Sequence, residues 1–237
     1  MEFRPLDATS MRQIKQYTDT FKSIQGKKLD LLIMTQGIMT IAGRTELPEC
    51  IDRKMALHYH GRQLLMCELL PTLKEDAKVI VVFDGVFGSP TKLNWEDPDL
   101  KTHFSLGKAA DHCMAMNDAM AQFHAAQQQR QGTNRRHFVH AWPGGVNSSL
   151  YKELLWYLGP LARVPGCLIG VSPDTCAENL LNGASELKGE FRVLTYVLVF
   201  VRTYRWLNEE NQDEYERLIS FDPWVQKEPC GTGLDVR

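Results

Sequence analysis

The chain has 237 residues, of which 43% are hydrophobic and 24% charged, as is usual for a globular protein with a full core. Its 27 basic and 29 acidic residues give a net charge of −2, which excludes the basic surface typical of proteins that bind nucleic acid. The longest apolar run, residues 193–201, is far shorter than the ~20 residues that cross a bilayer. Residues 1–11 contain no apolar signal segment, so we expect a cytoplasmic protein without a membrane span.

The cysteines and histidines form no pattern typical of a metal site. The six cysteines are scattered without a CxxC pair, which favours reduced thiols over a zinc site or a disulfide framework. His58 and His60 do not converge on one face of a helix, and His137 and His140 point to opposite faces of a strand. The sequence therefore predicts no bound metal.

The first half of the chain alternates helical and strand patterns. Apolar spacing predicts a helix over 10–24 that is capped by Ser10. The short apolar run 29–34 is typical of a strand buried on both faces. A long amphipathic helix is expected over 51–73, ending near Pro71, and a strand rich in β-branched residues over 78–83.

The second half continues the alternation. The composition of 106–129 predicts a helix, and 137–142 a strand that ends at Pro143. A serine cap and Pro173 in the first turn indicate a helix over 172–182. Strands that alternate with helices predict an α/β fold, a parallel sheet with helices on both faces. Residues 192–206 could form a last strand, and the acidic segment after them carries no motif.

Glycine follows each of the three predicted strands, at residues 35–37, 84–85 and 143–146. One such loop would only mark the end of a strand. Parallel sheets, however, bind ligands beyond the carboxyl ends of their strands, and glycine lets the backbone approach a ligand closely. Three such loops predict a binding site at this edge.

The order and spacing of several motifs over residues 3–186 resemble one family. The motifs are Asp7-Ala8-Thr9, Met34-Thr35-Gln36-Gly37, KVIVVFDG ending at Gly85, Phe104-Ser-Leu-Gly-Lys108 and Pro143-Gly144-Gly145-Val146-Asn147-Ser148. Together they resemble the short-chain dehydrogenase/reductase family, in its retinol-dehydrogenase-like and fungal reductase-like branch. The resemblance implies a Rossmann-like parallel sheet that lacks the first strand-helix units, with residues 1–190 as a partial domain and 191–237 as a divergent C-terminal segment of it.

The resemblance also implies roles for individual residues. Lys108 matches the family's catalytic lysine, whereas Phe104 stands at the tyrosine, Asp84 at the serine and His58 at the structural asparagine. It assigns cofactor binding, of NADP or NAD, to Asp7, Gly37, Lys108, Pro143, Gly144, Val146 and Ser148.

Two departures from the family pattern bear on activity. Phe104 has no proton to exchange with a substrate oxygen, which is what the family's tyrosine does. The sequence also has no GxxxGxG turn of the kind that holds a pyrophosphate. Asp84 or His58 as a substitute acid is a hypothesis that these departures prompt.

Three interpretations stay open. The first is an NAD(P)-dependent oxidoreductase acting on an alcohol or ketone of a small apolar molecule, as in fungal secondary metabolism. The second is an inactive homologue that binds ligands or acts as a scaffold, and the third is a truncated gene product. The resemblance further implies a small-molecule substrate and a homodimer through the helices at 51–73 and 106–129.

Overall fold

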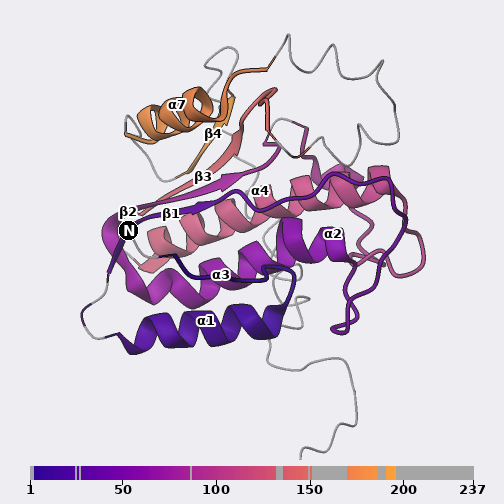
Figure 1. The fold of residues 1–237 in the computed structure, drawn as a ribbon, viewed down its shortest axis with the longest axis horizontal. Helices are drawn as coiled ribbons and strands as arrows, with labels where there is room; N and C mark the ends of the chain where they lie inside the picture. The colour runs from indigo at the N-terminus through magenta and orange to yellow at the C-terminus, as the bar shows by residue number, and fades with distance from the viewer. Residues whose placement is uncertain are drawn as a thin grey trace, which may run out of the picture.

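The computed structural model describes residues 3–24, 26, 28–85, 87–131, 136–148, 150, 170–185 and 191–195. In these residues four parallel strands form one sheet in the order β1-β2-β3-β4 (Figure 1). The strands are β1 (Leu29–Met34), β2 (Leu73–Val82), β3 (His137–Trp142) and β4 (Phe191–Thr195). The predicted α/β class with a parallel sheet is confirmed.

Helices cover both faces of the sheet. Figure 1 shows α1 (Met11–Ser23), α2 (Arg53–Met55), α3 (Gly61–Leu69) and α4 (Leu106–Gln131) on one face, and α7 (Pro173–Ser185) on the other. The strands contribute side chains to the cores on both faces of the sheet, because successive side chains of a strand point to opposite faces. Val79, Val81 and Phe138 enter the larger core under α1, α3 and α4, whereas Ile80 and Val139 enter the smaller core under α7.

The predicted caps of the first and last helices are confirmed. The Ser10 hydroxyl accepts a hydrogen bond from the Gln13 N–H at 3.3 Å, and the Ser172 hydroxyl accepts one from Thr175 at 3.1 Å. Each bond satisfies one of the backbone donors that a helix start leaves unpaired. Local sequence is therefore sufficient to fix where these two helices begin.

The predicted helix over 51–73 is wrong in its continuity. Asp52 caps α2, a π-helical turn η1 (Ala56–His60) follows, and α3 ends in a 3-10 turn η2 (Leu70–Thr72). Pro71 cannot donate a helical hydrogen bond, so β2 begins at Leu73, five residues before its predicted start. The remaining short helix is the 3-10 turn η3 (Pro90–Lys92).

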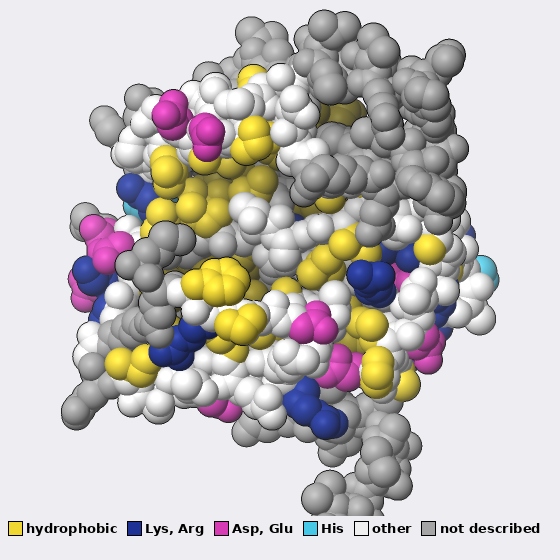
Figure 2. Space-filling model, viewed as in Figure 1, with side chains coloured by type: hydrophobic (Ala, Val, Ile, Leu, Met, Phe, Trp, Pro, Cys, Tyr) yellow, Lys and Arg dark blue, Asp and Glu magenta, His cyan; other side chains and the backbone are white. Residues whose placement is uncertain are grey.

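The prediction that β1 is buried on both faces is also wrong. Within the described part of the chain, β1 pairs with β2 alone, and its side chains Leu31 and Ile33 are 36% and 41% exposed. Figure 2 shows hydrophobic side chains gathered on this side of the sheet, between α7 and the helices of the other face. The reason is that the core of α7 lies over β2 and β3 and leaves β1 uncovered.

The helices that the resemblance assigns to a dimer interface are largely buried within a single chain. In α4 every side chain from 112 to 122 is buried, as are those of 61–66 in α3. In the described segments no helix combines the length and the apolar character needed to cross a membrane.

Candidate active site

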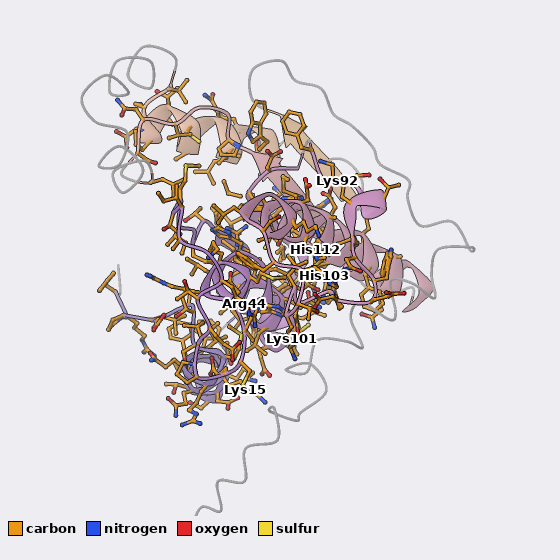
Figure 3. All side chains as sticks on the ribbon, turned by 90° about the vertical axis from the view of Figure 1, so that its right-hand side faces the viewer. Lys15, Arg44, Lys92, Lys101, His103 and His112 are labelled. Atoms are coloured by element: carbon orange, nitrogen blue, oxygen red, sulfur yellow. The ribbon has the colours of Figure 1, made fainter. Side chains whose placement is uncertain are left out.

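The site predicted from the loops lies where the strands end. Figure 1 shows that the first turn of α4 reaches the same side of the molecule as the carboxyl ends of β1 and β2. Figure 3 looks at this side, with His103, Lys101 and Arg44 in view. The segments 35–38, 83–88, 94–108 and 143–148 therefore provide the side chains to consider.

After β1, the chain brings Gly37 and His58 together. The Nε2 atom of His58 accepts a hydrogen bond from the Ile38 N–H at 3.0 Å, and a Cβ atom on Gly37 would lie 3.4 Å from it. His58 sits in the π-helical turn, where its carbonyl accepts a bond from the Asn117 amide at 2.8 Å. Burial lowers the pKa of His58 to about 4. His58 is therefore a neutral acceptor that holds this loop.

The loop after β2 is held in place by α4. Asp84 accepts a hydrogen bond from the Phe87 N–H at 3.3 Å, and Gly88 packs directly on Asp118 of α4. Asp118 in turn lies 2.5 Å from Nδ1 of His140 on β3, and both side chains are buried. Asp84 thus lies at the edge of the site, on a loop that packs against a buried carboxylate–imidazole contact for which the sequence gave no signal.

Phe104 and Lys108 differ in how they face solvent. Phe104 is half-buried against the larger core, and the Lys54 ammonium lies 5.0 Å from its ring centroid. Lys54 itself donates to the Gly43 carbonyl at 2.7 Å and to Asp52 at 3.3 Å. Lys108 is exposed on the first turn of α4. The ammonium of Lys108 is therefore available to a ligand, while Phe104 fills space.

The loop after β3 turns back toward the start of α7. Gly144 has a φ of 68°, a backbone conformation that favours glycine, so the turn depends on this residue. Val146 then pairs with Val171, and the Ser148 N–H donates to the Val146 carbonyl at 2.8 Å. Pro143, Gly144 and Val146 are half-buried and Ser148 is exposed. The structure places this predicted segment at the carboxyl end of its strand.

Asp7 is bonded within its own turn. Its carboxylate accepts from the Thr9 N–H at 2.9 Å and from the Thr9 hydroxyl at 2.7 Å, and these bonds lower its pKa. The turn packs on α3, where a Cβ atom on Gly61 would lie 2.6 Å from the Ala8 carbonyl oxygen. The structure links Asp7 to the start of α1 and to α3, with no described contact to the loops at the strand ends.

Two further groups were missed by sequence reasoning. Asp97 lies 3.3 Å from the exposed His103, one residue before Phe104. Arg62 is buried on α3 with its guanidinium over the Phe83 ring, and its Nε and Nη1 atoms have no hydrogen-bond partner in the described part of the chain. Helical spacing from His58 places Arg62 on the same face, but nothing in the sequence distinguishes it from a solvated arginine.

None of the known protein-family profiles matches the chain. It is 36% identical to the oxidoreductase AN1596 of Emericella nidulans over 133 residues, which are 54% of this chain and 37% of that protein. It is 29% identical to the mouse polyprenol dehydrogenase over 200 residues, 79% of this chain and 57% of that protein. The chain thus spans less than two thirds of either relative.

Solved structures of short-chain dehydrogenases/reductases have a similar fold. A short-chain dehydrogenase/reductase from Burkholderia multivorans with bound NADP superposes with a TM-score of 0.56 and 18% identity, covering 86% of this chain and 76% of that one. The chain therefore has the fold of solved short-chain dehydrogenases/reductases, and it is similar in sequence to part of an oxidoreductase and part of a dehydrogenase. The Rossmann-like architecture expected from the motifs is confirmed. Phe104, Lys108, Asp84 and His58 stay the positions that the resemblance assigns to an active site.

Proposed function

We propose that this chain is an NAD(P)-dependent oxidoreductase of the short-chain dehydrogenase/reductase type that acts on an alcohol or ketone of a small apolar molecule. The observation that carries the proposal is that the first turn of α4, which carries the exposed Lys108, lies on the same side of the molecule as the carboxyl ends of the parallel strands. This edge is where open α/β sheets bind their ligands. The names of the two curated relatives, an oxidoreductase and a dehydrogenase, support the same reaction class.

The described residues fit the nicotinamide end of a dinucleotide. The tight turn at Gly144 lets the backbone approach a flat ring closely, and Lys108 offers donors that suit ribose hydroxyls. Gly37 and Ser148 supply further polar groups at the same edge. When bound, a nicotinamide would supply or accept hydride; the loops and Lys108 would bind and orient it.

The described residues include no counterpart of the glycine-rich turn that would bind the pyrophosphate of a dinucleotide. The sequence contains no glycine-rich turn opening a helix, and Asp7 is engaged with Thr9. Lys108 and the loop at 143–148 would therefore carry a larger share of cofactor binding in this chain than in a protein with such a turn. NADP and NAD are equally compatible with the described residues.

A second candidate function is that of a ligand-binding homologue without catalysis. Phe104 favours it, because a benzene ring cannot donate a proton to a substrate oxygen. The homologue would use the same edge of the sheet, so cofactor binding is common to both candidates and turnover separates them.

The experiment is a titration of the folded 237-residue chain with NADPH and with NADH, followed by cofactor fluorescence. Saturable binding that Lys108→Met weakens supports the proposal, with Lys28→Met as a matched control because Lys28 lies before β1, at the opposite end of the sheet. A folded chain that binds neither cofactor would contradict both the enzyme and the cofactor-binding homologue.

Several finer properties extend the proposal. We place the protein in the cytoplasm and in the fungal reductase-like branch, with a role in secondary metabolism. We propose one domain over 1–190 with 191–237 as its divergent C-terminal segment; β4 begins that segment and joins the sheet. A homodimer would need a surface other than the buried stretches of α3 and α4, and the oligomeric state in solution tests it.

A further inference from the structure

The Asp97 carboxylate and the exposed His103 imidazole lie next to each other in the loop before Phe104, whose side chain cannot donate a proton. The Nδ1 atom of His103 lies 3.3 Å from Oδ2 of Asp97, and the two side chains are 62% and 10% exposed. His103 is the residue directly before Phe104, so their Cα atoms are about 3.8 Å apart. The pair is therefore at the start of α4, where the family keeps its proton donor.

The Asp97 carboxylate is held as an acceptor. It receives the N–H groups of Lys101, Thr102 and His103 at 2.7, 2.9 and 2.9 Å. Burial alone would raise the pKa of Asp97, but these backbone bonds outweigh burial and hold it well below its usual range. Because an ionised carboxylate only accepts, the Nδ1 atom of His103 must donate to it. The Nε2 atom is then the ring nitrogen that is left for a ligand, on a side chain that is 62% exposed.

The loop that carries the pair is fixed to its surroundings. His112 of α4 binds it twice, since Nε2 accepts from the Asn94 N–H and Nδ1 lies within hydrogen-bond distance of the Pro98 carbonyl, each at 3.0 Å. Arg44 donates to the Asp99 carbonyl at 3.1 Å. Figure 3 shows His103 near His112 and Lys101 on the side of the molecule where the strands end. A fixed loop holds a reacting group in place better than a mobile one.

Lys108 is the residue proposed to bind the cofactor ribose, and three other polar side chains considered as donors are already engaged. His58 uses its Nε2 atom as an acceptor and is neutral because of burial. Lys54 donates to Gly43 and Asp52 and is 7% exposed. Asp84 accepts from the Phe87 N–H. His103, in contrast, combines a ring oriented by Asp97 with a side chain that is 62% exposed.

We propose that His103, oriented by Asp97, is the proton donor for carbonyl reduction in this chain, in place of the tyrosine hydroxyl that Phe104 lacks. The inference rests on the proposed oxidoreductase function. In the reductive direction the carbonyl carbon accepts hydride from a reduced nicotinamide, and the π electrons of the C=O bond move to oxygen. That oxygen takes the proton from Nε2 of the imidazolium, leaving a neutral ring that regains a proton from solvent. Alcohol oxidation is the reverse.

Asp97 acts as a positioning residue in this scheme. It fixes the ring so that Nε2, rather than Nδ1, meets the substrate, and its negative charge stabilises the imidazolium that carries the proton. The same arrangement of a buried carboxylate behind a histidine recurs where a histidine transfers protons.

The test compares His103→Gln with the matched control His137→Gln in the full chain. His137 begins β3 and so lies at the opposite end of the sheet. We expect His103→Gln to lower kcat for NADPH-dependent reduction of 9,10-phenanthrenequinone by about 10²-fold or more, with the NADPH dissociation constant unchanged. Adding Phe104→Tyr to His103→Gln, or free imidazole to His103→Ala, should restore part of the lost rate. His137→Gln should leave both constants as they are.

A second measurement does not depend on turnover. Diethyl pyrocarbonate modifies accessible imidazoles, and peptide mass spectrometry gives the rate at each histidine. With NADP⁺ and 9,10-phenanthrenequinone at about ten times their dissociation constants, modification of His103 should slow about tenfold while that of His137 does not change. Equal rates with and without ligands, or full kcat in His103→Gln with normal NADPH binding, would overturn the role of His103 alone. A chain that binds no NADPH overturns the oxidoreductase function and this inference with it.

Discussion

The contact between Gly88 and Asp118 gives the sharpest stability prediction. A Cβ atom at position 88 would lie 2.3 Å from Oδ2 of Asp118, 3.3 Å from its Cγ and 3.2 Å from the Met114 carbonyl oxygen. The φ of Gly88 is not in the left-handed region, so alanine fits the backbone and the collision is the only obstacle. Asp118 cannot move aside freely, because its other oxygen lies 2.5 Å from the buried His140.

From these distances, Gly88→Ala should destabilise the fold by about 1–3 kcal/mol through overpacking. Asp118→Ala should cost more, about 3–5 kcal/mol, because it leaves the fully buried His140 without its carboxylate. In the Asp118→Ala background the closest contact of the new methyl group is gone and only the 3.2 Å contact to Met114 remains. The double variant should therefore be more stable than the sum of the single changes predicts, by about 1–3 kcal/mol.

Equilibrium urea unfolding, followed by tryptophan fluorescence and by circular dichroism, measures all four corners of this cycle. Gly107→Ala is a matched control, because nothing lies within 4 Å of a Cβ atom at that position. Costs that add to within about 0.5 kcal/mol would refute the close contact between the loop after β2 and α4. A Gly88→Ala variant as stable as the parent would do the same.

Three further predictions concern the site. Phe104→Tyr with Asp84→Ser should raise NADPH-dependent carbonyl reduction by about 10²-fold over the parent chain, and an unchanged rate with intact cofactor binding would count against a cleft that is otherwise competent. Because the folded pKa of His58 is lowered to about 4 while the unfolded chain binds protons near pH 6.5, stability should fall by up to about 3 kcal/mol as pH drops from 6.5 to 4. His58→Asn should flatten that decline in urea unfolding at several pH values; an unchanged slope would be inconsistent with a neutral His58. Arg62→Met should change the unfolding free energy by less than about 1 kcal/mol, because the buried guanidinium has two unpartnered nitrogens; a loss of several kcal/mol in the same assay would contradict this.

The elements that were predicted well are those with a local physical cause. The strand over 137–142 and the helix beginning after Ser10 have the predicted limits, because β-branched and aromatic residues favour the strand and the serine caps the helix. The helix expected over 51–73 was predicted less well. Its π-helical turn depends on tertiary contacts such as the bond from the Asn117 amide to the His58 carbonyl, and a hydrophobic pattern does not contain that information, whereas its end near Pro71 was predicted.

The candidate site was predicted in part. The glycine loops lie at the carboxyl edge of the sheet as predicted, and the motif order assigned Phe104 and Lys108 to the start of α4; that ligands bind there stays a prediction. The Asp97–His103 pair was not predicted, because its two members are joined by a loop conformation that backbone bonds define. The pairing of Asp118 with His140 joins a helix to a strand 22 residues further along, and no local rule links them.

By itself the sequence determined the α/β class, the starts of α1, α4 and α7, the positions of β1 and β3, and the loss of the tyrosine hydroxyl at Phe104, because each depends on residue type and near neighbours. The tertiary structure alone decided which polar side chains are buried or exposed. His58 became a neutral acceptor and Arg62 a buried cation, whereas His103 was left as an oriented, exposed imidazole. The physical reason is that hydrogen bonding and desolvation depend on partners brought together from distant parts of the chain.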